Sequence, residues 1–183
     1  MDLWRWDWLP ELGAGHEDFS YEFRAGSHVL SGTVSAVLEG RAIEGTYLVE
    51  ADAAWRTRRV VVDLASPGGR LELRANGSGR WSDKDGVWIP ALDGCLDIDI
   101  SLTPATNTLP IRRLDLAIGQ AAEIEVAYVL APELRLRTGR QVYERLDERR
   151  WRFQAPDSGF TAELTVDAEG FVIDYPGLFT RAK

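Results

Sequence analysis

The chain has 183 residues, of which 45% are hydrophobic and 27% are charged, a composition typical of one ordinary globular domain. Its 29 Asp and Glu residues outnumber its 21 Lys and Arg residues, and the resulting formal net charge of -8 argues against broad affinity for nucleic acid or anionic membranes. Cys95 is the single cysteine, which excludes an intramolecular disulfide and a cysteine-based zinc site within one chain.

Hydrophobic and polar residues alternate with period two along most of the chain, which predicts half-buried β-strands. The N-terminal tryptophans Trp4, Trp6 and Trp8 alternate in this way, and Phe19, Tyr21 and Phe23 share one face of the next strand. Further strands are predicted over residues 29–38, 43–51, 55–64, 70–75, 95–102, 124–130, 134–142, 151–155 and 160–166, with short ones near Trp81, Trp88, Val172 and Phe179.

Compact turn signals separate these strands, at residues 67–69, 76–77, 83–86, 157–159 and 168–170. Most connections are therefore expected to be hairpins in a large antiparallel sheet, which must curl into a roll, a sandwich or a barrel to bury one face. One short helix is predicted after Thr108, with Pro110 as an early helical residue. No linker or repeat is evident, so we expect a single mostly β domain over residues 1–183.

The N-terminal segment and the hydropathy of the chain bear on location. Charged residues interrupt the apolar run of residues 1–8, unlike the core of a signal peptide, and no run approaches the roughly 20 apolar residues of a membrane span. We therefore expect a cytoplasmic protein without an integral membrane segment. Its oligomeric state is not indicated.

Strong signatures of cofactor or metal chemistry are missing from the sequence. It contains no phosphate-binding loop and no dinucleotide fingerprint, and its two histidines, His16 and His28, are too far apart for a helical zinc pair. No cofactor and no metal site are expected.

The segment CLDIDISLTPATNTLPIRRL, residues 95–114, offers the clearest candidate site. Alternation predicts one apolar face (Leu96, Ile98, Ile100, Leu102) and one polar face (Asp97, Asp99, Ser101, Thr103). A polar face in water needs no partner, whereas one lining a cavity needs compensating arginines, for which Arg112 and Arg113, or Arg56, Arg58 and Arg59, are candidates. Such a lining is suited to hydroxyl-rich groups.

A catalytic interpretation of the same segment stays open. Carboxylates at positions i and i+2 of a strand have Cα atoms roughly 6.6 Å apart, which approaches the separation used in glycoside hydrolysis. Asp97 and Asp99 could then act on a glycoside or glycolipid. A third hypothesis is a protein-interaction scaffold that uses exposed strand edges or the tryptophan-rich N-terminus.

Several segments, in their order along the chain, carry a family resemblance. They are Trp6 with Glu17, residues 47–52 and 55–58, 79–81, 92–99, 103–114, 127–129 and 174–179. In these segments the chain resembles the bacterial family of putative glycolipid-binding domain proteins, formerly a domain of unknown function. The resemblance implies a many-stranded spiral β-roll, an open barrel-like sheet similar to bacterial carriers of lipoproteins and lipids, which are exported.

The resemblance also implies non-catalytic binding of a glycolipid or a similar amphipathic ligand in the concavity of the sheet. With the family in view, we expect the ligand-binding residues to be Glu17, Trp55, Arg58, Asp97, Asp99, Asn107, Arg112 and Tyr175. Aromatic rings would stack on a sugar or an acyl chain, and charged groups would contact the head group. For Trp55 and Tyr175 the alternative is core packing, and for Asn107 it is local turn hydrogen bonding.

Overall fold

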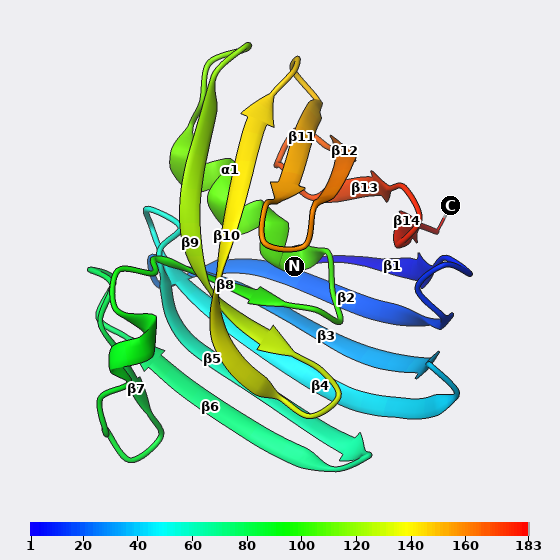
Figure 1. The fold of residues 1–183 in the computed structure, drawn as a ribbon, viewed down its shortest axis with the longest axis vertical. Helices are drawn as coiled ribbons and strands as arrows, with labels where there is room; N and C mark the ends of the chain where they lie inside the picture. The colour runs from blue at the N-terminus through cyan, green and yellow to red at the C-terminus, as the bar shows by residue number, and fades with distance from the viewer. Residues whose placement is uncertain (183) are drawn as a thin grey trace.

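The computed structural model describes residues 1–182, and one open sheet of 14 strands dominates it (Figure 1). The mostly β, single-sheet architecture expected from the sequence is confirmed. The strands are β1 (Asp2–Trp8), β2 (Ala14–Arg24), β3 (Ser27–Leu38), β4 (Arg41–Asp52), β5 (Thr57–Ser66), β6 (Gly69–Ala75), β7 (Trp81–Asp83), β8 (Asp97–Ile100), β9 (Ala121–Leu130), β10 (Arg135–Arg145), β11 (Arg150–Ala155), β12 (Phe160–Val166), β13 (Val172–Tyr175) and β14 (Phe179–Arg181).

Neighbouring strands of the sheet are mostly neighbours in the chain. The order is β7-β6-β5-β4-β3-β2-β1-β14-β13-β12-β11-β10-β9-β8, so the first and last strands meet inside the sheet, with Trp6 opposite Arg181. All pairs of strands are antiparallel except β8 and β9, which run parallel. A parallel pair needs a crossover of a dozen or more residues, and the long connection that contains the helix supplies it.

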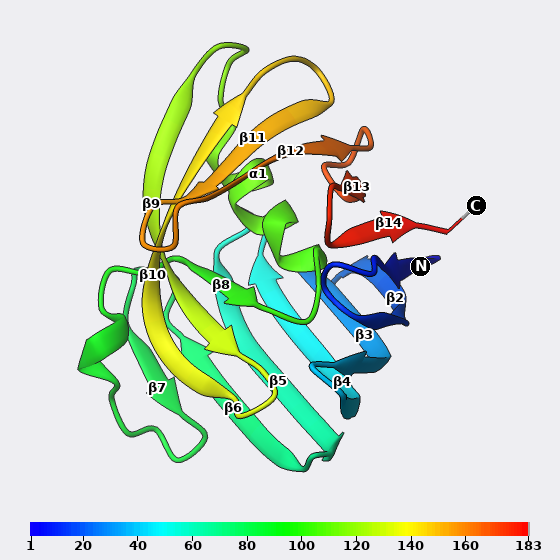
Figure 2. The same cartoon turned by 45° about the vertical axis from the view of Figure 1, so that its right-hand side comes forward.

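The sheet rolls up so that two limbs face each other (Figures 1 and 2). Strands β1–β7 form the lower limb, β9–β12 arch above it, and β8 lies between them together with α1 (Thr108–Leu114). The free side of edge strand β8 reaches the lower limb, because Thr57 N donates to Leu96 O at 3.0 Å and Ile98 N donates to Thr57 Oγ1 at 3.2 Å. The inner edge of the roll is therefore hydrogen-bonded rather than open to further strands.

The core fills the space between the limbs and uses the alternating apolar side chains. Trp6 and Trp81 are fully buried, and their indole nitrogens donate to Val172 O and Cys95 O, each at 2.8 Å. Those bonds satisfy the indole donors, which would otherwise lose hydration on burial. Trp8 is also buried, so two of the N-terminal tryptophans are part of the core.

Helical structure is limited to three short pieces. The helix predicted after Thr108 is present as α1, and the left-handed Asp115 (φ 45°) ends it. Single 3-10 turns cover η1 (Pro90–Leu92) and η2 (Ala105–Asn107). Within residues 1–182, no helix has the length and hydropathy needed to cross a bilayer.

Three strand predictions differ from the structure. The strand predicted over residues 95–102 is only Asp97–Ile100, because the chain turns at Thr103, whose Oγ1 accepts from Ala105 N at 3.0 Å. Trp55 lies in the β4–β5 turn with φ 62° rather than in a strand, since Asp52 accepts from Ala54 N and caps that turn. Trp88 forms only an isolated bridge with Ser82.

Candidate functional site

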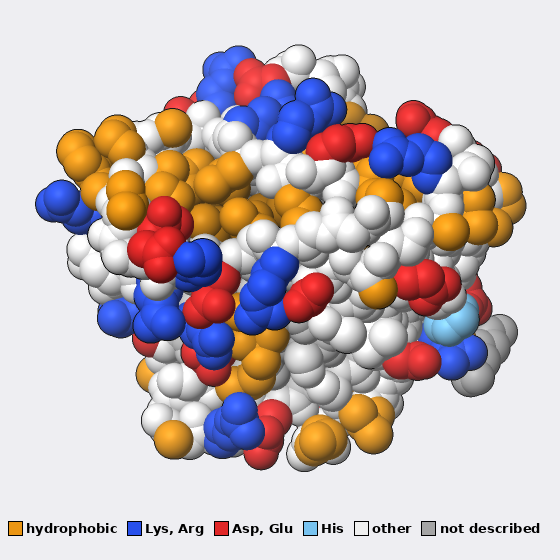
Figure 3. Space-filling view, turned by 90° about the horizontal axis from the view of Figure 1, so that it is seen from below, with side chains coloured by type: hydrophobic (Ala, Val, Ile, Leu, Met, Phe, Trp, Pro, Cys, Tyr) orange, Lys and Arg blue, Asp and Glu red, His pale blue; other side chains and the backbone are white. Residues whose placement is uncertain are grey.

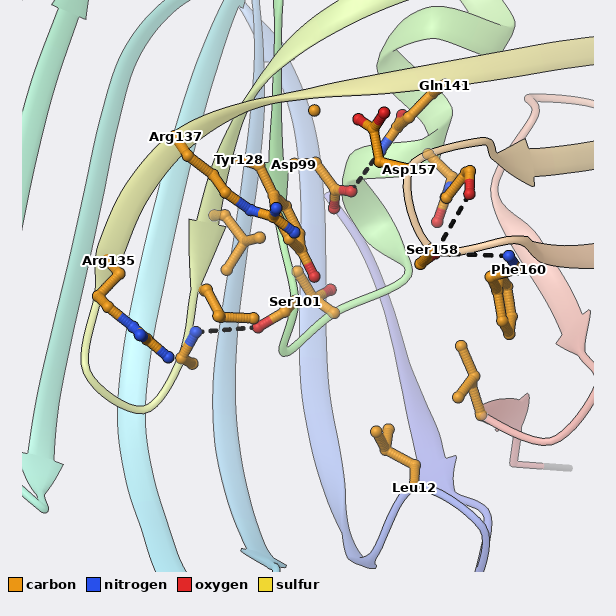
Figure 4. A pocket seen from close by; sticks show the side chains of 18 of the residues that line it. Leu12, Asp99, Ser101, Tyr128, Arg135, Arg137, Gln141, Asp157, Ser158 and Phe160 are labelled. Atoms are coloured by element: carbon orange, nitrogen blue, oxygen red, sulfur yellow. Dashed lines mark hydrogen bonds between the residues drawn. The ribbon is translucent and has the colours of Figure 1, made fainter. Parts of the chain in front are cut away.

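A cavity of about 830 Å³ opens at one end of the roll, between the lower limb and the β9–β10 hairpin (Figure 4). Its size falls in the range of small-molecule sites, about 300–1,000 Å³. We call it the large cavity. Its inner part, the floor, is formed by buried or half-buried polar side chains: Asp99, Thr103, Asn107, Tyr128, Gln141 and Tyr175. Its rim has an apolar part, formed by Leu12, Leu130, Phe160 and Leu178, and a charged part, formed by Arg41, Glu133, Arg135, Arg137, Arg140 and Asp157.

Asp99 is the central acidic group of the floor, where it projects from β8 (Figure 4). Its Oδ1 accepts from Thr106 Oγ1 at 3.2 Å, and its Oδ2 accepts from Gln141 Nε2 on β10. Burial raises the pKa of Asp99 to about 6, and the two donors oppose that rise. The carboxylate is therefore held in place and changes its charge near neutral pH.

Two tyrosines line the cavity together with Asp99, and Tyr128 lies directly beside it, as its partner in the parallel β8–β9 pair. Tyr128 is on β9 and Tyr175 is on β13, and burial raises the pKa of Tyr128 to about 12 and that of Tyr175 well above its ordinary value. The charge of Asp99 adds to both shifts. Within residues 1–182 neither phenol forms a side-chain hydrogen bond, so both hydroxyls are available to a bound molecule.

Asn107 completes the polar floor at the start of α1. Its Nδ2 donates to the hydroxyl of Tyr143 at 2.9 Å, which fixes the amide against β10. Its hydrogen bond is thus made to a distant strand rather than within a local turn, although Asn107 is also the residue before the helix.

Charged side chains surround the entrance, and two pairs of them tie the hairpins together. Arg41 on β4 lies 2.7 Å from Glu133 in the β9–β10 turn, and Arg140 lies 2.7 Å from Asp157 in the β11–β12 turn. Seen from below, basic and acidic side chains are interspersed with exposed hydrophobic groups (Figure 3). This face of the molecule therefore carries no uniform charge.

A smaller recess of about 470 Å³ lies at the other end of the strands, beside the β4–β5 and β12–β13 turns. It contains Trp55 and Arg112, two of the residues expected near the ligand. The ring of Trp55 stacks on His28, with 3.6 Å between ring centres, and the guanidinium of Arg112 lies 5.6 Å from the ring of Trp55. Trp55 is buried and packs against both of these side chains.

Asp97 is fully buried and does not line either opening. Arg113 on α1 donates to both of its carboxylate oxygens, with Nη2 2.6 Å from Oδ2. Burial raises the pKa of Asp97, against the opposing effect of Arg113. The sequence predicts that an enclosed carboxylate in this segment needs a nearby arginine, and Arg113 is the arginine that pairs with Asp97.

Glu17 is also fully buried, beside the large cavity rather than in its lining. Its Oε1 accepts from the hydroxyls of Tyr47 and Thr103, and Thr103 is itself part of the cavity floor. Burial raises the pKa of Glu17 to about 8. Its Oε2 has no hydrogen-bond partner among residues 1–182, so no donor stabilises a negative charge on that oxygen.

The structure thus brings together three of the eight expected site residues, Asp99, Asn107 and Tyr175, at one cavity. Arg58 lies apart from both openings, where it donates to Ala75 O at 3.1 Å and lies 3.6 Å from Asp52. Of the remaining residues, Trp55 and Arg112 lie at the other end of the strands, and Glu17 and Asp97 are enclosed in the interior, which strand periodicity does not reveal.

Sequence reasoning missed the cavity face of β10, which presents Arg135, Arg137, Gly139 and Gln141. Alternation places these four residues on one face of the strand predicted over 134–142, so a signal existed. A polar strand face has the same sequence pattern whether it faces water or a cavity, so the pattern alone does not identify these four residues as cavity lining.

Comparison with known proteins agrees with this architecture. The model of the family described as "Putative glycolipid-binding" matches residues 5–181. The chain is similar to a DUF1089-family protein from Pseudomonas aeruginosa of known crystal structure, with 42% identity, a TM-score of 0.82, and coverage of 91% of this chain and 92% of that one. The comparison with curated proteins finds no match. With the family model covering nearly its whole length and the roll matching a solved relative, the chain belongs to the putative glycolipid-binding family.

Proposed function

We propose that this protein binds a glycolipid, or a similar amphipathic molecule, in the large cavity without transforming it. The observation that carries the proposal is the contrast within that cavity. Asp99 and two tyrosine hydroxyls without a hydrogen-bond partner among residues 1–182 lie at the floor, and aliphatic and aromatic side chains form the apolar part of the rim. The family description supports the same ligand class.

The polar floor suits a sugar because it offers both kinds of hydrogen-bonding group. The Asp99 carboxylate accepts from sugar hydroxyls, whereas the hydroxyls of Tyr128 and Tyr175 both donate and accept. Phe153 and Tyr175 add aromatic surface to the wall. The head group would therefore enter first, in contact with β8, β9 and β13.

The apolar rim suits the hydrocarbon part of the same molecule. Leu12, Leu130, Phe160 and Leu178 come from four separate turns or strand ends, so together they surround the entrance. Burying an acyl chain against them contributes about 0.8 kcal/mol for each methylene removed from water. An amphipathic ligand would use both regions, which a free sugar or a free fatty acid would not.

The hydrolase alternative receives less support from the geometry. It requires Asp97 and Asp99 to face one substrate, but Asp97 is fully buried and held by Arg113, outside the cavity lining. The Asp97 carboxylate is paired with Arg113, and it does not contact the cavity in which a glycoside would bind.

Filling the cavity tests the proposal. A Cβ at Gly139 would meet its nearest atom, Cβ of Tyr128, at 3.7 Å, so this cavity-lining position has room to begin a side chain, and Gly139→Leu is the filling substitution. Thr138→Leu is the matched control, since the neighbouring Thr138 is exposed and does not line the cavity.

Native mass spectrometry after incubation with a total bacterial lipid extract is the measurement. We expect lipid-sized adducts on the wild type and on Thr138→Leu, and their loss on Gly139→Leu with an unchanged circular dichroism spectrum. No adduct on the wild type, or equal adducts on both variants, would overturn the proposal.

A further inference from the structure

Most arginines of this acidic protein lie within 4.0 Å of a carboxylate oxygen. Across the described residues 1–182, the arginines without such a partner are Arg80, Arg112, Arg135, Arg137, Arg145 and Arg149. With 29 acidic residues in the chain, a free guanidinium is not explained by a shortage of carboxylates. Two of these free guanidinium groups lie at the large cavity.

Arg135 and Arg137 are next to each other on the cavity-facing side of β10. They lie opposite Leu130 and Tyr128 of β9, and both line the cavity (Figure 4). The guanidinium of Arg137 lies 5.2 Å from the centre of the Tyr128 ring, which positions it over the edge of the polar floor. Both side chains are exposed, so the pair belongs to the solvent-accessible part of the cavity lining.

The two other arginines of the lining differ from this pair. Arg41 and Arg140 are each neutralised by a carboxylate at 2.7 Å, Glu133 and Asp157 respectively. Neutral pairs of this kind brace the entrance and have little charge left for a ligand. Arg135 and Arg137 are near the same two carboxylates, Glu133 and Asp157 respectively, and help to lower their pKa values, but neither guanidinium has a carboxylate oxygen within 4.0 Å.

Two guanidinium groups at positions i and i+2 of one strand face have Cα atoms roughly 6.6 Å apart. Like charges that close repel each other, and the repulsion is relieved when an anion lies between them. The planar guanidinium fork matches the oxygens of phosphate, sulfate or carboxylate, with two hydrogen bonds to each group.

We propose that the ligand of the large cavity is anionic and that Arg135 and Arg137 together bind a phosphate-type oxyanion of its head group at the rim. This inference rests on the proposed function and specifies its ligand class. The sugar hydroxyls would contact Asp99 and the tyrosines below, and the acyl part would pass along the apolar rim. A phosphoglycolipid has this combination of groups.

Isothermal titration calorimetry with three probes tests the inference. The probes are dihexanoyl phosphatidylinositol, a neutral dihexanoyl glycosylglycerol, both below their micelle concentrations, and inorganic phosphate. The variants are the double substitution Arg135→Gln/Arg137→Gln and, as control, Arg149→Gln, which removes another free arginine outside the cavity in the β10–β11 turn.

We expect the wild type and Arg149→Gln to bind the phosphatidylinositol at least about tenfold more tightly than the neutral lipid, and the double variant to lose that preference. Equal affinities for the two lipids in the wild type, or an unchanged preference in the double variant, would overturn the anionic assignment while leaving neutral glycolipid binding in place. If inorganic phosphate binds as tightly as the phospholipid, the claim that the bound oxyanion belongs to a lipid is wrong. If neither lipid binds the wild type, the proposed function itself fails.

Discussion

Arg113 and Asp97 form a buried two-pronged ion pair that joins α1 to the inner edge strand β8, with 3.0 Å from Nε to Oδ1 and 2.6 Å from Nη2 to Oδ2. The Asp97 side chain is fully enclosed, and that of Arg113 is 15% exposed. Arg113→Met should lower the free energy of unfolding by about 3–5 kcal/mol, because it leaves an uncompensated charge in the interior. Urea denaturation at pH 7 measures the change.

The same experiment on an exposed ion pair supplies the control. Arg5→Met removes the partner of Asp18, and both side chains of that pair are about half exposed, so little change is expected. Equal effects of the two substitutions would show that the Arg113 pair has no special role in stability.

Glu17 makes the free energy of unfolding depend on pH, and the sign of this dependence follows from its pKa. Its pKa is about 8 in the folded protein against an ordinary value of 4.5, so folding favours the protonated form. Its contribution to stability is complete below pH 4.5 and is lost as the pH rises toward 8, by on the order of 4 kcal/mol. Glu17→Gln imitates the neutral carboxyl, and its free energy of unfolding should fall less between pH 5 and pH 8 than that of the wild type. Parallel curves for the two proteins would contradict this pKa assignment.

Gly32 and Gly139 are both strand glycines but have opposite surroundings. A Cβ at Gly32 would meet Tyr47 Cε1 at 2.4 Å and Glu17 Oε1 at 2.7 Å, whereas one at Gly139 meets nothing closer than 3.7 Å. Gly32→Ala should destabilise the protein by about 1–3 kcal/mol through overpacking, and Gly139→Ala should be neutral or stabilise it slightly. Thermal unfolding of both variants measures the difference, and a stable Gly32→Ala would mean that Tyr47 and Glu17 can move apart.

Asp99 should make ligand binding pH-dependent. A sugar hydroxyl donates to the carboxylate, and the pKa of Asp99 is about 6, so affinity should increase from pH 5 to pH 7. Asp99→Asn should abolish this increase and weaken binding about 10- to 100-fold, the range of a hydrogen bond to a charged group. Titrations of the neutral dihexanoyl glycosylglycerol at both pH values provide the test. A pH-independent affinity in the wild type would remove Asp99 from the head-group site.

Cys95 should be unreactive in the folded protein. It is fully buried, and burial raises the pKa of its thiol from 9.0 to about 11. At pH 8 the thiolate population is then about 100-fold smaller than in the unfolded chain, so alkylation by iodoacetamide should be slower by at least that factor. Mass spectrometry after timed labelling in buffer and in urea compares the two rates, and fast labelling in buffer would show that the Cys95 region opens.

The strands, the hairpins and α1 could be predicted from the sequence because each depends on residues close together in the chain. Alternation correctly places Ile98 and Ile100 in the core, on the face of β8 opposite to Asp97 and Asp99. It could not distinguish the environments of Asp97 and Asp99, because α1 covers one and the cavity opens at the other.

Some residues of the large cavity were not predicted, and some predicted site residues lie outside it. The positions of both groups depend on how the sheet curls. Trp55 and Tyr175 are both aromatic residues next to turns, but the roll places them at opposite ends. Arg135 and Arg137 look like solvent-facing strand residues until β9 and β10 are seen to arch over the lower limb. Only long-range pairing of strands determines these positions.

The pairing of β1 with β14 also bears on how the chain reaches this fold. Hairpins between sequence neighbours assemble β1–β7 and β9–β14 from local contacts, whereas the pair of Trp6 with Arg181 closes a loop of nearly the whole chain. Closing so large a loop has the highest entropic cost of any pairing in the sheet, so the two halves should form before they join. A circular permutant that connects β14 directly to β1 would make this pair a local hairpin. The slowest step of folding should then be the pairing of the two strands whose connecting turn was opened to create the new termini.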